Sequence, residues 1–130
     1  MSNANSLAGS WAGRYYYPNG LEPVPFDASL IQLGGAISGT ITEIATIGWH
    51  AGRPLMSTIS GGVEGTEVFF TKTYESNDTG YGVVQYHGRV NADATEIRGR
   101  WVIGNESAAF VMTRPARVVQ TETKKIAEPV

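Results

Sequence analysis

Few side chains in this sequence could do acid–base chemistry. Glu43 and Lys72 stand in segments where hydrophobic and polar residues alternate, and His50 stands beside Trp49 in the segment TIGWHAGRP. Histidine titrates near neutral pH unaided, so His50 could act as a general base or as part of a lid. A solvated loop position is the alternative for His50. Catalysis by Glu43 and Lys72 would need a further activated group, and none is evident, so we assign no catalytic residue and keep an enzyme only as an alternative.

Metal and cofactor chemistry has little support in the sequence. There is no cysteine, which excludes disulfides, thiolate nucleophiles and cysteine-ligated metals. The two histidines, His50 and His87, lie in separate segments without a neighbouring cluster of Asp and Glu, so we expect no metal site. Gly34-Gly35 and Gly61-Gly62 lack the spacing of a phosphate-binding loop. We therefore expect no cofactor.

Composition and charge limit the partners. The chain has 130 residues, of which 42% are hydrophobic and 17% charged, as in a globular domain. Its net charge of −2 gives no reason to expect binding to nucleic acid or to an anionic membrane. No segment approaches the roughly 18 apolar residues of a membrane-spanning helix. The start MSNANSLAGS has neither a basic nor an apolar run, so we expect a cytoplasmic protein.

Period-2 alternation dominates the chain and helical periodicity is nearly absent. Turn residues such as Pro18-Asn19-Gly20, Gly34-Gly35 and Gly104-Asn105 separate the alternating segments. The predicted strands are Ser10–Tyr17, Pro25–Leu33, Ala36–Ala45, Leu55–Val63, Thr66–Glu75, Gly82–Asn91, Thr95–Ile103 and Ser107–Arg114.

Short joins connect antiparallel neighbours, which leaves a sandwich or a closed barrel as the architecture. Closure removes exposed strand edges, and no long crossover connection is visible. We therefore predict an all-β fold, an eight-stranded antiparallel up-and-down β-barrel over residues 8–114. Residues 1–7 are expected to form an N-terminal tail and residues 115–130 a C-terminal tail.

Alternation also assigns side chains to the barrel interior. Inward glycines at 13, 39, 61, 88 and 99 could leave space for a ligand, or they could mark strand bends in a filled core. Aromatic walls with a few polar groups are typical of a small-molecule pocket, so we expect a small hydrophobic or aromatic ligand. The predicted ligand-binding residues are Tyr15, Tyr17, Glu43, Ser57, Lys72, Tyr74, Tyr86 and Trp101.

Two inward charges need a separate explanation. If Glu43 and Lys72 both face the cavity, they could pair with each other or bind the polar end of a ligand, because a buried charge needs a partner. Alternatively, both lie at the open rim in water. In the strand Thr66–Glu75, Phe69 and Phe70 fall on opposite faces, which leaves the inward parity of this strand ambiguous.

The outer face of strands six to eight suggests self-association. Val83, Val102, Ala109 and Val111 point outward there, and apolar surface of this kind tends to mark an interface. We therefore expect a homo-oligomer joined through these strands. A self-associating structural protein with a filled barrel is the second alternative to ligand binding.

The two ends of the barrel sequence resemble a known group. Gly9-Ser10-Trp11 in the first strand and Thr113-Arg114 at the end of the last are similar to the calycins, the group that contains lipocalins, fatty-acid-binding proteins and avidins. The resemblance implies that Trp11 closes the base of the barrel and that Arg114 packs across it by a cation–π contact.

Within this group the strand order most resembles the avidins. LAGSWAG, GGAISGTIT, TEVFFTKTY, YGVVQYHGRV and IRGRWVI follow that order over residues 7–114. The resemblance puts Tyr74 and Trp101 where avidins have pocket tryptophans, and Ser57 at a polar contact. The Asn and Ser that avidins place after their first tryptophan are replaced here by Gly13 and Tyr17 or their neighbours, and no tryptophan follows Trp101. The resemblance therefore implies the fold and not biotin as the ligand.

Overall fold

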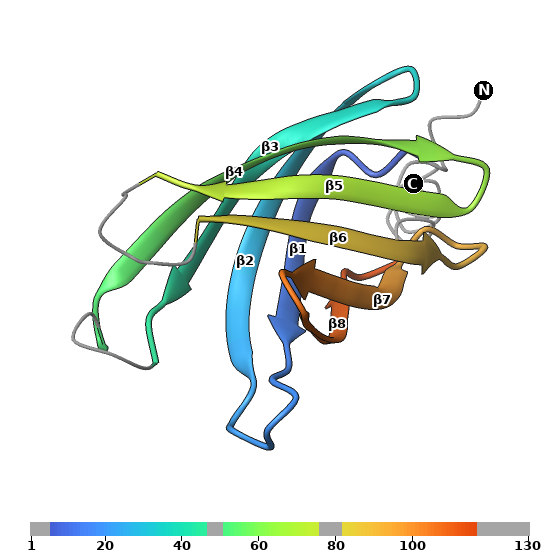
Figure 1. Ribbon diagram of the computed structural model, residues 1–130. Coiled ribbons are helices and arrows are strands. Elements are labelled where there is room, and N and C mark those ends of the chain that lie inside the picture. The colour runs from blue at the N-terminus through green and yellow to red at the C-terminus, as the bar shows by residue number, and fades with distance from the viewer. Residues whose placement is uncertain (1–5, 47–50, 76–81, 117–130) are drawn as a thin grey trace, which may run out of the picture.

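The computed structural model describes residues 6–46, 51–75 and 82–116. These residues form a single closed barrel of eight antiparallel strands in which each strand pairs with its neighbours in sequence and β1 pairs with β8. Figure 1 shows the turns β2–β3, β4–β5 and β6–β7 at one end of the barrel. The strands are β1 (Gly9–Tyr15), β2 (Val24–Leu33), β3 (Ala36–Ile44), β4 (Pro54–Glu64), β5 (Glu67–Tyr74), β6 (Val83–Val90), β7 (Glu96–Ile103) and β8 (Glu106–Thr113).

The predicted fold class is confirmed, and no predicted strand end differs from the observed one by more than two residues. Burial alternates residue by residue, most regularly in β2, because successive side chains point to opposite faces of the sheet. In β5 the ambiguity is resolved: Phe70 is buried, whereas Phe69 is 44% exposed. Phe69 lies outside because it pairs with Gly62 on β4, where its ring covers the glycine backbone.

The inward glycines do not leave empty space, so that part of the expectation is wrong. A side chain at Gly39, Gly61 or Gly99 would collide with the backbone of the neighbouring strand. At Gly13 the position of a Cβ is already filled by the ring of Phe26. These glycines instead allow close approach of strands and rings, which is the strand-bend alternative.

Arg114 and Trp11 lie at the end of the barrel that carries the three turns. The Arg114 guanidinium lies 4.3 Å from the centre of a Trp11 ring and donates hydrogen bonds to the carbonyl oxygens of Ser6, Ala8 and Ala94. The Trp11 indole donates to the carbonyl of Leu7 at 2.8 Å. Leu7, which the sequence places in the N-terminal tail, is only 1% exposed. This end is therefore packed shut, and we call it the closed end.

The middle of the barrel is filled by aromatic rings. Phe70 stacks on Tyr86 with ring centres 4.8 Å apart, and Phe110 meets Tyr86 edge-on at 4.9 Å. Such pairs add about 0.5–1.5 kcal/mol beyond the area that they bury. The interior can hold a ligand only towards the opposite, open end. Within the described residues, no helix has the length and apolar character needed to cross a membrane.

Candidate functional site

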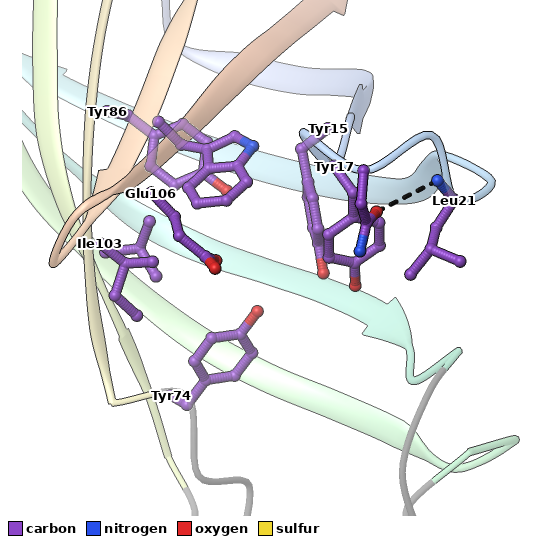
Figure 2. Close-up of a pocket in the computed structure, with 10 residues that line it drawn as sticks. Tyr15, Tyr17, Leu21, Tyr74, Tyr86, Ile103 and Glu106 are labelled. Carbon is purple, nitrogen blue, oxygen red and sulfur yellow. Dashed lines mark hydrogen bonds between the residues drawn. The ribbon is translucent and has the colours of Figure 1, made fainter.

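A pocket of about 270 Å³ lies at the open end of the barrel. Its walls come from β1, β5, β6, β7 and β8 and from the segment that follows β1. Figure 2 shows these side chains around a common space. The lining residues are Tyr15, Tyr17, Asn19, Leu21, Tyr74, Val84, Tyr86, Trp101, Ile103 and Glu106.

The aromatic wall is held by edge-on contacts and one backbone hydrogen bond. Tyr15 meets Tyr17 at 5.8 Å and Trp101 at 6.5 Å between ring centres, at interplanar angles of 82° and 77°. The Trp101 indole donates to the carbonyl oxygen of Tyr16 at 2.8 Å, which ties β7 to the segment after β1. Tyr86 lies beside Trp101 as its cross-strand partner. The rings are thus fixed before any ligand arrives, which reduces the entropy cost of binding.

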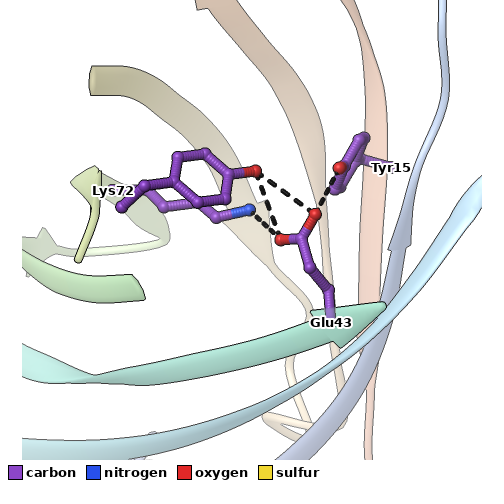
Figure 3. Close-up of polar contacts among 4 residues, drawn as sticks. Tyr15, Glu43 and Lys72 are labelled. Carbon is purple, nitrogen blue, oxygen red and sulfur yellow. Dashed lines mark hydrogen bonds and ion pairs between the residues drawn. The ribbon is translucent and has the colours of Figure 1, made fainter. Parts of the chain in front are cut away.

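A polar cluster lies inside the barrel near these rings and centres on the carboxylate of Glu43 (Figure 3). Lys72 Nζ lies 2.6 Å from Glu43 Oε1, and the Tyr15 hydroxyl donates to Oε2 at 2.5 Å. The Tyr74 hydroxyl lies 3.3 Å from both oxygens. The side chains of Lys72 and Glu43 are 0% and 1% exposed. Glu43 and Lys72 are therefore the buried pair that the sequence offered as one alternative, and not a solvated rim.

The register of the sheet brings this pair together across one intervening strand. Glu43 on β3 pairs with Leu55 on β4, and Lys72 on β5 pairs with Ile59 on the same strand. Ser57 lies between these two positions on β4, opposite Tyr74, and is fully buried. Among the described residues its hydroxyl has no hydrogen-bond partner.

The Lys72 ammonium lies among aromatic rings. Its Nζ is 4.6 Å from the ring centre of Tyr74, 4.9 Å from Tyr15, 5.8 Å from Tyr86 and 5.9 Å from Phe26. Burial lowers the pKa of Lys72, and the Glu43 carboxylate opposes that shift. The ring faces partly replace the water that the ammonium has lost.

The buried tyrosines remain protonated, and Tyr15 and Tyr74 act as hydrogen-bond donors to Glu43. Burial is the main cause that raises the pKa of Tyr15, Tyr74 and Tyr86, and the nearby Glu43 charge adds to it. A neutral phenol can donate to Glu43, whereas a phenolate beside the same carboxylate would be repelled. The cluster is therefore a carboxylate that accepts from one ammonium and two phenols.

Some of the residues that the sequence assigned to the site line the pocket, and others do not. Glu43, Ser57 and Lys72 do not line the pocket, and Trp11 and Arg114 lie at the closed end. The pocket brings together Tyr15, Tyr17, Tyr74, Tyr86 and Trp101. Trp49 and His50 lie outside the described residues.

Sequence reasoning missed several pocket residues. Val84 and Ile103 share the inward parity of Tyr86 and Trp101 but were not assigned to the site. Asn19 and Leu21 belong to a loop that carries no periodicity. Glu106 is the most informative omission, because it has the inward parity of Ala108 and Phe110. The predicted strand began one residue too late, at Ser107, so this parity was not applied to Glu106.

Among the described residues, no three His, Cys, Asp or Glu side chains lie close enough together to hold a metal ion. His87 instead contacts Glu67 at 2.6 Å on the outer surface. Inside the barrel, Glu43 and Lys72 pair with each other. The pocket lining is mainly aromatic and apolar.

No protein-family model and no curated protein matches this sequence. Solved structures do match the fold. A redesigned β-barrel, mFAP1, bound to DFHBI, has a TM-score of 0.67 and 14% identity, and the match covers 87% of this chain and 100% of that one. A second redesigned barrel, mFAP0, also bound to DFHBI, has a TM-score of 0.61 and 13% identity, with 83% and 98% covered. At these identities the likeness shows the eight-stranded barrel fold.

Proposed function

We propose that this protein is a non-catalytic binding module for a small aromatic or hydrophobic molecule, held in the pocket at the open end. The observation that carries the proposal is the wall of five aromatic side chains, Tyr15, Tyr17, Tyr74, Tyr86 and Trp101, around a space of about 270 Å³. This volume lies just below the roughly 300–1,000 Å³ of pockets for drug-sized ligands. The ligand is therefore small, with one or two rings.

Two redesigned barrels of similar fold support the proposal, because both were solved bound to DFHBI. A binding module also fits the chemistry better than an enzyme does. A general acid or base must reach its substrate within hydrogen-bond distance. Glu43 and Lys72 are buried, bonded to each other and absent from the pocket lining.

The finer relationship of the barrel is also a proposal. We infer a kinship with calycins, and among them with avidin-type barrels, from the contact between Trp11 and Arg114 at the closed end. We further propose a homo-oligomer joined through the outer faces of β6–β8, where Val83 and Val102 are 49% and 43% exposed. Apolar side chains left in water at this level favour association.

The proposed function is tested by native mass spectrometry of freshly purified protein, followed by titration with DFHBI and a panel of one- and two-ring aromatic compounds. Binding should change tryptophan fluorescence, because Trp101 lines the pocket. A Trp101→Phe variant should lose most of this change. A protein that carries no bound small molecule and responds to no member of the panel would contradict the proposal.

A matched pair of tyrosine variants locates the binding site. Tyr17→Ala removes a ring from the pocket wall, so the affinity for a bound probe should fall about ten-fold, the loss expected for an aromatic contact of about 1–1.5 kcal/mol. Tyr16 is its neighbour but points outward and does not line the pocket. Tyr16→Ala should therefore leave the affinity unchanged, and equal losses in both variants would place the ligand elsewhere.

A further inference from the structure

The charge of the pocket limits the class of ligand that it can take. Of the ten lining residues drawn in Figure 2, Glu106 is the only one with an acidic or basic side chain that is ionised at neutral pH. The buried charges nearby cancel, because Glu43 and Lys72 form an ion pair. The described lining therefore carries one uncompensated negative charge.

Glu106 is the first residue of β8 and pairs with Ile103 across the β7–β8 hairpin. Its parity is that of the inward residues Ala108 and Phe110. Figure 2 shows its carboxylate pointing into the space bounded by Tyr17, Tyr74 and Tyr86.

The Glu106 side chain makes no hydrogen bond or ion pair with any described residue. The nearest arginine along the hairpin is already engaged, since Arg100 donates to the Ser107 hydroxyl at 3.0 Å. An exposed carboxylate in the lining of an aromatic pocket, with no ion pair to a described residue, is suited to a cation from outside.

Aromatic faces and a carboxylate together recognise organic cations. A ring face attracts a cation by about 0.5–2 kcal/mol, more when water is excluded. The same barrel already holds a cation in this way, because the Lys72 ammonium lies within 4.6–5.9 Å of four ring centres and beside Glu43. Three of these rings, Tyr15, Tyr74 and Tyr86, also line the pocket, where Glu106 supplies a second carboxylate and the described lining contains no lysine.

An anionic ligand fits the site poorly. The described lining carries the Glu106 carboxylate and no ammonium or guanidinium group, so it opposes a second anion. Resting on the proposed function, we infer that the ligand is a small aromatic or apolar molecule with a positively charged nitrogen, a protonated or quaternary amine. Its body lies against the aromatic wall and its nitrogen lies near Glu106.

This inference is tested with three probes. Each has a benzyl group attached to a tetrahedral group, and the charge of the tetrahedral group differs among them. They are benzyltrimethylammonium, its neutral carbon isostere neopentylbenzene, and the anion phenylmethanesulfonate. Binding is followed by NMR titration at the Trp101 indole N–H. We expect the cation to bind about five- to ten-fold more tightly than the neutral isostere, which is the effect of roughly 1–1.4 kcal/mol from one carboxylate and the ring faces. The anion should bind more weakly than both.

Variants assign the effect to Glu106. Glu106→Gln should reduce the preference for the cation to the part that the ring faces supply and leave the affinity for the neutral isostere unchanged. Glu106→Lys should reverse the preference toward the sulfonate. Glu64→Gln, an exposed glutamate in β4 at the closed end, is the matched control and should change nothing. Glu106 begins a strand and is itself exposed, so these variants should fold.

The outcomes separate this inference from the proposed function. If the neutral isostere binds as tightly as the cation, the cationic ligand is overturned and the binding module stands. If the preference for the cation is as large in Glu106→Gln as in the parent protein, the role of Glu106 is overturned. If no probe of any charge binds, both the inference and the proposed function fail.

Discussion

At the scale of single residues, Glu43 is the group on which the buried polar cluster depends. Its two oxygens accept from Lys72, Tyr15 and Tyr74. A buried ion pair contributes little net stability compared with apolar residues, but removing one partner leaves an unpaired charge in the interior. The cluster therefore holds side chains in place near the pocket, and the stability of the protein should fall only when one of its charged partners is removed.

Glu43→Gln should lower the free energy of unfolding by about 3–5 kcal/mol, because the Lys72 ammonium is left without its counter-charge. The double variant Glu43→Leu/Lys72→Met removes both charges and should recover most of this loss. Glu67→Gln is the control, since Glu67 pairs with His87 and Arg89 on the surface, and it should cost less than about 1 kcal/mol. Urea unfolding measures all three, and a double variant as unstable as Glu43→Gln would contradict the expectation.

The buried tyrosines should make the protein sensitive to alkali. A group whose pKa is raised in the folded state contributes stability that is present below its unfolded pKa and is lost as pH rises above it. Tyr15, Tyr74 and Tyr86 are such groups, with an ordinary pKa of 10.0. Each should lower the stability by up to about 1.4 kcal/mol per pH unit above pH 10.

Lys72 has the opposite effect on the pH dependence, because burial lowers its pKa from 10.5 and its contribution to stability therefore rises with pH up to that value. The loss of stability caused by the tyrosines should consequently be steepest above pH 10.5. Tyr86→Phe should reduce the slope of stability against pH by about one proton. Tyr16→Phe, at a position 37% exposed, should leave the slope unchanged. Equal slopes for Tyr86→Phe and the parent protein, measured by urea unfolding between pH 9 and 12, would show that the buried phenols do not control the effect.

At the scale of elements, the closed end joins segments that are far apart in the sequence. Arg114, just after β8, bonds to carbonyl oxygens before β1 and to that of Ala94 before β7. A planar guanidinium can stack on Trp11 and donate in several directions at once, which an ammonium cannot do. Arg114 therefore links the segments that meet at the closed end by hydrogen bonds.

Arg114→Ala should lower the free energy of unfolding by about 2–4 kcal/mol, from lost hydrogen bonds to a charged donor and lost stacking. Arg114→Lys should recover only part of this stability. Arg98→Ala is the matched control, because among the described residues Arg98 forms its ion pair with Glu96 alone, on the surface. This variant should cost less than about 1 kcal/mol. The affinity of a probe at the open end should stay unchanged in all three, and a large change there would mean that the two ends are coupled.

At the scale of the whole molecule, exposed apolar side chains occur at several places on the outer surface of the described residues, and two groups of them are candidates for an interface. Val83 and Val102 lie on adjacent strands in the region proposed as the interface. Ile31, Leu33 and Phe69, on β2 and β5, are 57%, 77% and 44% exposed. Either region could bury apolar area against a second copy, at about 25 cal/mol per Å².

Sedimentation velocity with two charge variants distinguishes these regions. The parent protein should sediment as a dimer or tetramer of the 14.0 kDa chain. Val102→Glu should dissociate it, because an unpaired carboxylate would be buried in the interface, whereas Leu33→Glu should not. A parent protein that is a monomer at micromolar concentration would contradict association altogether, and dissociation by Leu33→Glu alone would move the interface to β2–β5.

The sequence by itself determined the strands, their order and the facing of most side chains, with β5 the exception because Phe69 and Phe70 are adjacent. Alternation of polar and apolar residues is a local property, so Trp11, Tyr15, Tyr86 and Trp101 could be assigned inward without knowing their neighbours. Short turns then imply antiparallel pairing and a closed barrel. These steps need no information about contacts between distant residues.

Only the tertiary structure decided how far along the barrel each inward side chain lies. Depth depends on the stagger and tilt of the strands, which is a property of the closed sheet and not of one strand. Lys72 and Glu43, 29 residues apart, meet inside the barrel for this reason, while Tyr74, two residues after Lys72, reaches the pocket. Closure of the barrel also makes the inward glycines points of close contact between strands, and it brings Glu106 to the pocket. The alternation of residues along one strand does not predict these contacts, because they depend on how neighbouring strands pack.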